Sequence, residues 1–326
     1  LSKSLFIFSY NDPDQIDSIL LDRIHRIKFD NLTTDEKIVI VNKYILPELN
    51  NKMGFENIVS ITNDIIKYII EIYTKEPGVR KLKELLFDLY GEINLEILKN
   101  EKSTIKNIPI IITEQDIDEK YLEKYKKNIE TKIHAKNEIG IINGLWANSL
   151  GMGGIIPIQT LLYPSSTFLD LKLTGLQGDV MKESMSVAKS LAWNLTKDDI
   201  KKKWLTYFEN TKCQGLHIHC PEGSISKDGP SAGTAITTAI YSLLNKKHIK
   251  NNIAITGEIN LNGDIMAIGG LEQKINGGIR AGINYFLYPT SNHKDFTDWE
   301  KKNKEVKNIT FIEISNIKEV FEHVFI

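Results

Sequence analysis

The hydrophobic pattern changes its period near residue 138, and this change constrains the fold more than any other feature. From residue 31 to about 123, apolar residues such as Ile38, Val41 and Ile45 recur at intervals of three or four, which is typical of amphipathic helices. After residue 138, short apolar runs alternate with helical patterns and glycine-rich turns. The sequence therefore predicts a helical part followed by a larger part of α+β or mixed α/β class.

Local signals predict where several helices of the first part begin and end. Thr33 and Glu36 have the spacing of a capping box, which predicts a helix start. Further helical patterns cover residues 63–76, which Pro77-Gly78 should stop, and residues 79–100.

The first residues show a different pattern. Leu5-Phe6-Ile7-Phe8 has the composition of a buried strand. A chain that opens inside a strand suggests a fragment of a longer protein. No basic segment followed by a long apolar core is present, so we expect no secretion signal.

The second part carries signals for alternating strands and helices. Thr196 and Asp199 predict one helix start, and Asn262-Gly263 predicts a hairpin between two strands. We expect strands near residues 139–147, 154–164, 168–175, 216–220, 285–289 and 309–314, with helices between the later ones.

Composition argues against several classes of function. The net charge is −1, so there is no general electrostatic attraction to nucleic acid or to an anionic membrane. No apolar stretch approaches the ~20 residues of a membrane span. The two cysteines, Cys213 and Cys220, favour a reducing compartment over a disulfide scaffold. We therefore expect a soluble intracellular protein.

The segment Gly229-Pro230-Ser231-Ala232-Gly233 has the Gly-x-Ser-x-Gly pattern of a nucleophile elbow. An elbow needs a strand that ends at the serine, whereas residues 221–230 separate Ser231 from the preceding strand. Ser231 is better placed at the beginning of a helix, where free N–H groups can stabilise an oxyanion. The small residues Ala232 and Gly233 leave room for a substrate backbone.

A serine at this position needs a base, and Lys274 is a candidate. A lysine acts as a base only when its pKa falls from about 10.4 towards 7 or 8, which burial in an apolar wall can achieve. Lys274 lies one helical turn after Gly270-Leu271, with Ile275 and Ile279 beside it. On spacing alone, an exposed helix lysine is the more common interpretation.

A metal site is the less favoured interpretation of Cys213, His217, His219 and Cys220. His217 and His219 share one face of a strand and could reach one ion, but Cys220 points to the opposite face. No HExxH or CxxC pattern accompanies them. We therefore expect no metal ligand among these residues.

Several long motifs of the second part resemble the proteolytic domain of the Lon family of ATP-dependent proteases. They are "GIINGLWANSLGMGGIIPIQ", "LTGLQGDVMKES", "PEGSISKDGPSAG" and "ITGEINLNGDIMAIGGLEQK", in the order of the family. The resemblance implies peptide-bond cleavage by a Ser–Lys dyad without a cofactor. The family serine of the Pro-Ser-Ala-Gly motif matches Ser231, and the family lysine that follows Gly-Gly-Leu matches Lys274.

The resemblance also implies supporting residues. Thr256 matches the residue that orients the lysine, and Glu258 lies near it in the same motif. Asp228 precedes the serine motif and is expected to shape the loop rather than act as a base, because a carboxylate beside a neutral lysine would raise its pKa. Gly229, Pro230 and Ala232 complete this support.

The first hundred residues resemble the end of a Lon AAA+ ATPase module. Asn11 matches the sensor-1 residue, Arg23 the arginine finger and Arg80 the sensor-2 residue. No Gly-x-x-x-x-Gly-Lys-Ser/Thr motif occurs in the sequence, and no acidic Walker B strand precedes Asn11. ATP and Mg²⁺ are therefore implied for the full-length protein, and this chain alone is not expected to hydrolyse ATP.

Together these matches predict four segments: an AAA+ core remnant (1–30), a helical lid (31–123), a linker (124–137) and a proteolytic domain (138–326). The family implies a homohexameric ring that degrades unfolded proteins, in the cytoplasm or the mitochondrial matrix. Two alternatives remain open. One is a catalytically silent assembly or regulatory module, and the other is a Ser–His hydrolase that uses His293.

Overall fold

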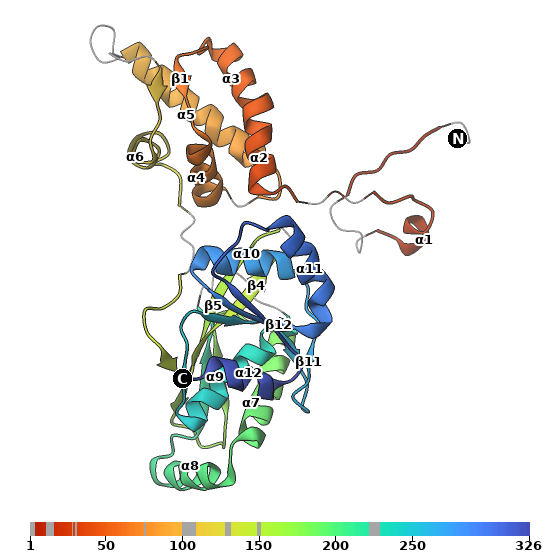
Figure 1. Cartoon of the computed structure of the whole chain (residues 1–326), viewed down its shortest axis with the longest axis vertical. Coiled ribbons are helices and arrows are strands. Elements are labelled where there is room, and N and C mark those ends of the chain that lie inside the picture. The colour runs from red at the N-terminus through yellow and green to blue at the C-terminus, as the bar shows by residue number, and fades with distance from the viewer. Residues whose placement is uncertain are drawn as a thin grey trace.

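The computed structural model describes residues 4–10, 16–27, 29, 31–74, 76–99, 109–127, 132–148, 151–221 and 229–326. Residues 31–127 form a largely helical unit (the helical unit, orange to yellow in Figure 1). Residues 132–326 form a larger unit around a central sheet (the α/β unit, green to blue). The mixed α/β class predicted from the change of period is confirmed. No helix in these described ranges is long and apolar enough to cross a bilayer.

The main helices of the helical unit are α2 (Thr34–Ile40), α3 (Leu46–Met53), α4 (Asn63–Tyr73) and α5 (Arg80–Lys99), with a π-helical turn, Val41–Ile45, between the first two. The predicted capping box is confirmed, because Thr33 accepts from the Glu36 N–H while the Glu36 carboxylate accepts from the Thr33 N–H. Helix α4 ends at Tyr73, earlier than predicted, because Thr74 already has an extended backbone. Buried Ile, Leu and Tyr side chains of α4 and α5 form the centre of this unit's core.

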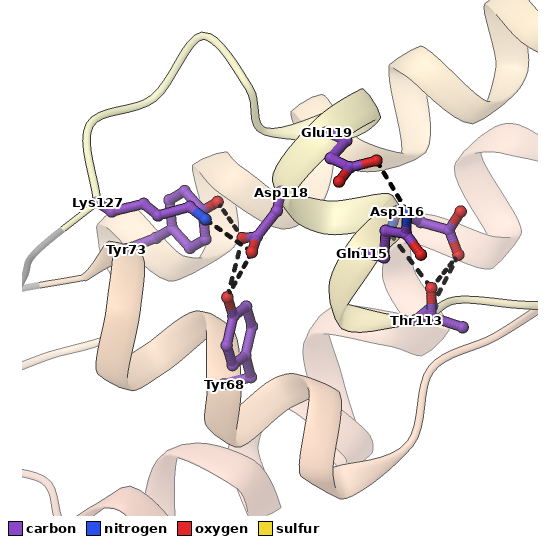
Figure 2. Close-up of polar contacts among 8 residues, drawn as sticks. All are labelled: Tyr68, Tyr73, Thr113, Gln115, Asp116, Asp118, Glu119 and Lys127. Atoms are coloured by element: carbon purple, nitrogen blue, oxygen red, sulfur yellow. Dashed lines mark hydrogen bonds and ion pairs between the residues drawn. The ribbon is translucent and has the colours of Figure 1, made fainter.

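The segment that follows α5 returns to the helical unit. Strands β1 (Val59–Ser60) and β2 (Ile110–Ile111) pair in parallel, and a short helical segment comes next, formed by α6 (Glu114–Asp116) and the π-helical turn Ile117–Tyr121. Asp118 of this segment accepts hydrogen bonds from the hydroxyls of Tyr68 and Tyr73 on α4 and forms an ion pair with Lys127 (2.6 Å), as Figure 2 shows.

A seven-stranded sheet forms the centre of the α/β unit, in the order β13-β12-β9-β4-β5-β7-β6. Strand β5 pairs antiparallel with both β4 and β7, and the other neighbours run parallel. The strands are β4 (Ile141–Ala147), β5 (Gly153–Tyr163), β6 (Leu171–Thr174), β7 (Gly215–His219), β9 (Ile253–Ile255), β12 (Tyr285–Pro289) and β13 (Thr310–Ile314).

Helices cover both faces of this sheet because its central strands are apolar on both sides. Ile253 and Ile255 point into one core, and Ala254 between them points into the other. The first core contains α7 (Asp179–Leu195), α9 (Gly233–Asn245) and α12 (Ile317–Val324), and the second contains α10 (Leu271–Ala281) and α11 (His293–Lys302). Helix α8 (Asp198–Thr211) lies next to α9.

Part of the segment expected as a linker lies along the α/β unit. The Ile133 N–H donates to the Ala281 carbonyl (3.3 Å), and the Asn251 side chain donates to the His134 carbonyl (2.8 Å). Residues 132–137 are therefore attached to this unit rather than free of it.

The prediction of a buried strand at residues 5–8 is wrong. Leu5 and Ile7 are 87% and 84% exposed, and this segment forms no strand. A strand needs a neighbour for its backbone groups, and the described residues provide none beside it. The first helix of the described residues is the short α1 (Ser18–Leu21), capped by the Asp17 side chain.

Two local expectations in the α/β unit also need correction. The N-cap position of α8 is Lys197, without a side-chain capping bond, and the hydroxyl of Thr196 donates back to the Ala192 carbonyl (2.9 Å) instead of capping α8. The hairpin around Asn262-Gly263 exists, but its strands are short, β10 (Glu258–Ile259) and β11 (Ile265–Met266), and the preceding β9 belongs to the main sheet.

Candidate functional site

A cavity of about 540 Å³ opens between the end of β4, the start of α9 and the start of α10. Ser231 and Lys274 both line it, although they are far apart in the sequence. Helices α9 and α10 both pack on β4 and β5, from opposite faces of the sheet, and the cavity lies where the two helices begin. The remaining lining residues are Leu145, Trp146, Ala147, Asn148, Ile156, Met181, Gly229, Pro230, Ala232, Glu258, Ala267, Ile268, Gly269 and Gly270.

Ser231 lies in a 3₁₀ turn, Pro230–Ala232, that leads directly into α9. Gly229 before it has φ 146°, a backbone conformation that favours glycine, and Pro230 occupies the first position of the turn, where no N–H is needed. Gly233 follows, and a Cβ there would lie 2.8 Å from the Ser184 hydroxyl and 3.0 Å from Ile259. The turn therefore presents Ser231 at the N-terminal end of α9, where the Gly233 N–H donates to the Pro230 carbonyl and the Thr234 N–H to the Gly257 carbonyl.

Lys274 is the fourth residue of α10 and is only 3% exposed. Its helix neighbours Leu271 and Ile275 are buried apolar residues. Burial lowers the pKa of the Lys274 ammonium from 10.5 to about 8, because the charged form loses its hydration. The expected apolar environment is present, and it makes the neutral amine accessible near physiological pH.

Thr256, just after β9, connects the two residues. The Lys274 ammonium donates to the Thr256 hydroxyl (3.2 Å), and that hydroxyl donates to the Ser231 carbonyl (3.3 Å). The Gly257 N–H donates to the same carbonyl (2.8 Å), while Thr234 donates to the Gly257 carbonyl through its N–H (3.1 Å) and its hydroxyl (2.9 Å). These hydrogen bonds fix the serine turn against Thr256 and Gly257, and Thr256 in turn bonds the Lys274 ammonium.

Among the described residues, no hydrogen bond joins the Ser231 hydroxyl directly to Lys274. Catalytic hydrogen bonds are often long before substrate binds, so this geometry is compatible with proton transfer. A serine hydroxyl and a lysine of lowered pKa that line one cavity can perform nucleophilic attack on a carbonyl.

The other expected site residues are placed as follows. Glu258, Gly229, Pro230 and Ala232 line the cavity. Asp228 and Asn11 lie outside the described residues. Arg23 and Arg80 are exposed, do not line the cavity, and lie before the α/β unit.

Sequence reasoning did not single out Trp146 and Met181, which line the cavity from β4 and α7. Both lie inside motifs quoted above, but the motifs do not tell which side chains face the serine. Thr234 was also missed, because its hydroxyl serves a carbonyl 23 residues away.

The histidines lie away from this cavity. His217 and His219 both bond the Thr174 hydroxyl (2.9 and 2.7 Å), and no group of three metal ligands occurs in the part of the chain that the structure describes. His293 is exposed and bonds Glu313 (2.6 Å). The Ser–His alternative therefore has no geometric support.

Comparisons with known proteins give one family. The model of the Lon protease C-terminal proteolytic domain matches residues 111–326, and that of the Lon protease AAA+ ATPase lid domain matches residues 52–106. Residues 111–127 of the first match pack on the helical unit, because Ile112, Ile117 and Tyr121 belong to its core.

Individual relatives agree with these matches. A Lon protease homolog of Acanthamoeba polyphaga mimivirus is 37% identical over 364 residues, covering 94% of this chain and 35% of the relative. The Lon protease of Aster yellows witches'-broom phytoplasma is 37% identical over 332 residues (100% and 39%), and that of Fusobacterium nucleatum subsp. nucleatum is 35% identical over 313 residues (95% and 39%). The chain thus spans less than two fifths of the length of these relatives. It belongs to the Lon protease family and carries the family's serine-protease domain.

Proposed function

We propose that this chain cleaves peptide bonds with Ser231 as the nucleophile and Lys274 as the general base. The observation that carries the proposal is the burial of Lys274 in the wall of the cavity that Ser231 lines, with Thr256 bonded to both. No carboxylate of the described residues forms an ion pair with Lys274, so its burial is costly for stability, and such a cost is common where a side chain serves catalysis.

The steps follow from the positions of the groups. The Ser231 hydroxyl attacks the scissile carbonyl while the neutral Lys274 amine takes its proton. Backbone N–H groups around Ser231 stabilise the oxyanion. Lys274 then gives a proton to the leaving amine, and water, activated by the same amine, hydrolyses the acyl-enzyme.

Supporting residues keep this geometry. Thr256 occupies one donor of the amine and so orients its lone pair towards the cavity. Gly229, Pro230 and Ala232 shape the serine turn, Asp228 shapes the preceding loop, and Glu258 contributes a polar group to the cavity wall.

The wider function rests on family membership. In the full-length protein we propose that ATP and Mg²⁺ drive delivery of unfolded proteins to a hexameric ring, with Asn11, Arg23 and Arg80 sensing the nucleotide. The proposed division of the chain is an AAA+ remnant (1–30), a lid (31–123), a linker (124–137) and a peptidase domain (138–326). The two free cysteines favour the cytoplasm or the mitochondrial matrix.

The test is cleavage of a fluorogenic peptide against pH by wild type, Ser231→Ala and Lys274→Ala, with oligomer size recorded. We expect both variants to be inactive at unchanged size, and the acidic limb of wild-type kcat/KM to lie near the Lys274 pKa of about 8. Full activity of Lys274→Ala would refute the base assignment. A silent wild type whose Ser231→Ala variant differs in no property would favour the regulatory module.

A further inference from the structure

Asn292 is a buried polar residue at a helix N-cap, but its side chain makes no capping hydrogen bond. It is the N-cap residue of α11 and is 3% exposed. Asparagine at an N-cap normally accepts a hydrogen bond from its own helix, yet no such bond is made here. A residue that departs from a local rule in a buried position indicates a different use of its side chain.

The Asn292 amide instead bonds both backbone groups of Ile268, its N–H and its carbonyl. Its oxygen accepts from the Ile268 N–H (2.9 Å), and its nitrogen donates to the Ile268 carbonyl (2.8 Å). The same nitrogen donates to the Asp295 carboxylate (2.7 Å). Because a carboxylate accepts only, Asp295 reinforces the amide orientation that the Ile268 N–H and carbonyl already require.

Ile268 belongs to the segment that separates the hairpin from α10. Residues 267–270 all line the cavity. Gly269 has open space where a Cβ would be, and Gly270, with φ 69°, is the N-cap of α10. Neither glycine has a side chain to anchor the segment, so its restraint depends on the buried Ile268 side chain and on the two bonds that Asn292 makes to the Ile268 backbone.

This restraint acts close to the lysine. The Lys274 N–H donates to the Gly270 carbonyl (3.1 Å) in the first turn of α10. A shift of Gly270 therefore moves the helix start, and with it the Lys274 amine relative to Thr256 and Ser231. Figure 1 shows α11 beside α10, and Asn292 is the N-cap residue of α11.

We propose that Asn292 is a positioning residue of the peptidase site, which holds the backbone of Ile268 and thereby sets where α10 presents Lys274 to the cavity. The inference rests on the proposed role of Lys274. It assigns to Asn292 no contact with substrate. Asp295 assists by reinforcing the orientation of the Asn292 amide.

The test compares Asn292→Ala with wild type, with Lys274→Ala and with a matched control, Ser291→Ala, which changes an exposed residue of the same turn. Readouts are kcat and KM against pH, the melting temperature, and amide hydrogen exchange of residues 265–275. We expect kcat of Asn292→Ala to fall about 10–100-fold with little change in KM, because small displacements of a catalytic group cost rates of this order. The acidic limb should move to higher pH, since a loosened wall admits water to Lys274. Ser291→Ala should behave as wild type.

Hydrogen exchange gives a result that does not depend on activity. The Ile268 amide should exchange faster in Asn292→Ala, and protection at the start of α10 should fall. Unchanged exchange there would overturn the inference. The inference would also be overturned if Asn292→Ala kept the wild-type kcat and the wild-type acidic limb of the pH profile while Lys274→Ala was inactive. That outcome would leave the Ser–Lys proposal standing. Full activity of Lys274→Ala would instead refute the Ser–Lys proposal itself.

If Asn292→Ala does not fold, two Asp295 variants test the same inference. Asp295→Asn keeps an acceptor for the Asn292 amide and should retain kcat. Asp295→Ala removes it, and should lower kcat and move the acidic limb. The inference would be overturned if the two variants had the same kcat and the same acidic limb in their pH profiles.

Discussion

Replacing Lys274 by methionine should abolish peptide cleavage and make the α/β unit more stable at neutral pH. The lysine is almost fully buried, and burial lowers its pKa from 10.5 to about 8. A methionine of similar length fills the same space without a charge. The gain in stability follows from the difference between the folded and the unfolded pKa.

The sign and size come from proton linkage. Because the folded pKa is lower than the unfolded one, the unfolded chain binds more protons between pH 8 and 10.5, so the free energy of unfolding rises with pH in that window. At pH 7 the buried ammonium costs about 3 kcal/mol relative to the unfolded chain. Loss of the hydrogen bond to Thr256 offsets about 1 kcal/mol of the gain. The net gain of Lys274→Met should be about 2 kcal/mol at pH 7 and close to zero at pH 9.5.

The assay is urea unfolding followed by tryptophan fluorescence at the two pH values. All four tryptophans, Trp146, Trp193, Trp204 and Trp299, lie in the α/β unit, so the signal reports that unit alone. Lys294→Met, at an exposed position of α11, is the control and should change stability by less than about 0.5 kcal/mol. A Lys274→Met variant that is less stable than wild type at pH 7, or a gain that is as large at pH 9.5, would refute the reasoning.

Three further outcomes follow from the contacts described. Thr256→Val keeps the shape but removes the hydroxyl between Lys274 and Ser231, so kcat should fall about 10²-fold with KM little changed; an unchanged kcat in peptide assays would contradict this. His293→Ala should leave peptide cleavage at the wild-type rate, because His293 lies outside the cavity, and loss of activity would revive the Ser–His alternative. Asp118→Ala leaves two tyrosine hydroxyls without their acceptor and should destabilise the helical unit by about 1–3 kcal/mol, measured as faster hydrogen exchange in α4; wild-type exchange there would show that the contacts in Figure 2 contribute little.

The elements that depend on neighbouring residues were largely predictable. The capping box at Thr33 and helix α5 match expectation because their signals act within one or two turns. The strand predicted at residues 5–8 failed for the opposite reason. Its hydrophobic composition was correct, but a strand exists only where another strand accepts its backbone.

The candidate site divides in the same way. The motifs around Ser231 and Lys274 drew attention to both residues, and family resemblance gave them roles. Spacing alone left Lys274 as an ordinary exposed lysine, and it gave no reason to single out Asn292. The burial of the first and the contact of the second with Ile268 depend on elements distant in the chain.

The sequence by itself determined the helical and α/β parts, most helices and strands, and the motifs of a Lon-type serine protease. These features follow from periodicity and from contacts between near neighbours in the chain. Only the tertiary structure decided that α9 and α10 meet at one cavity, that Thr256 bonds both key residues, and that Lys274 has a pKa of about 8. The physical reason is that hydration and proton affinity depend on everything packed around a group, and the residues packed around Lys274 come from distant parts of the chain.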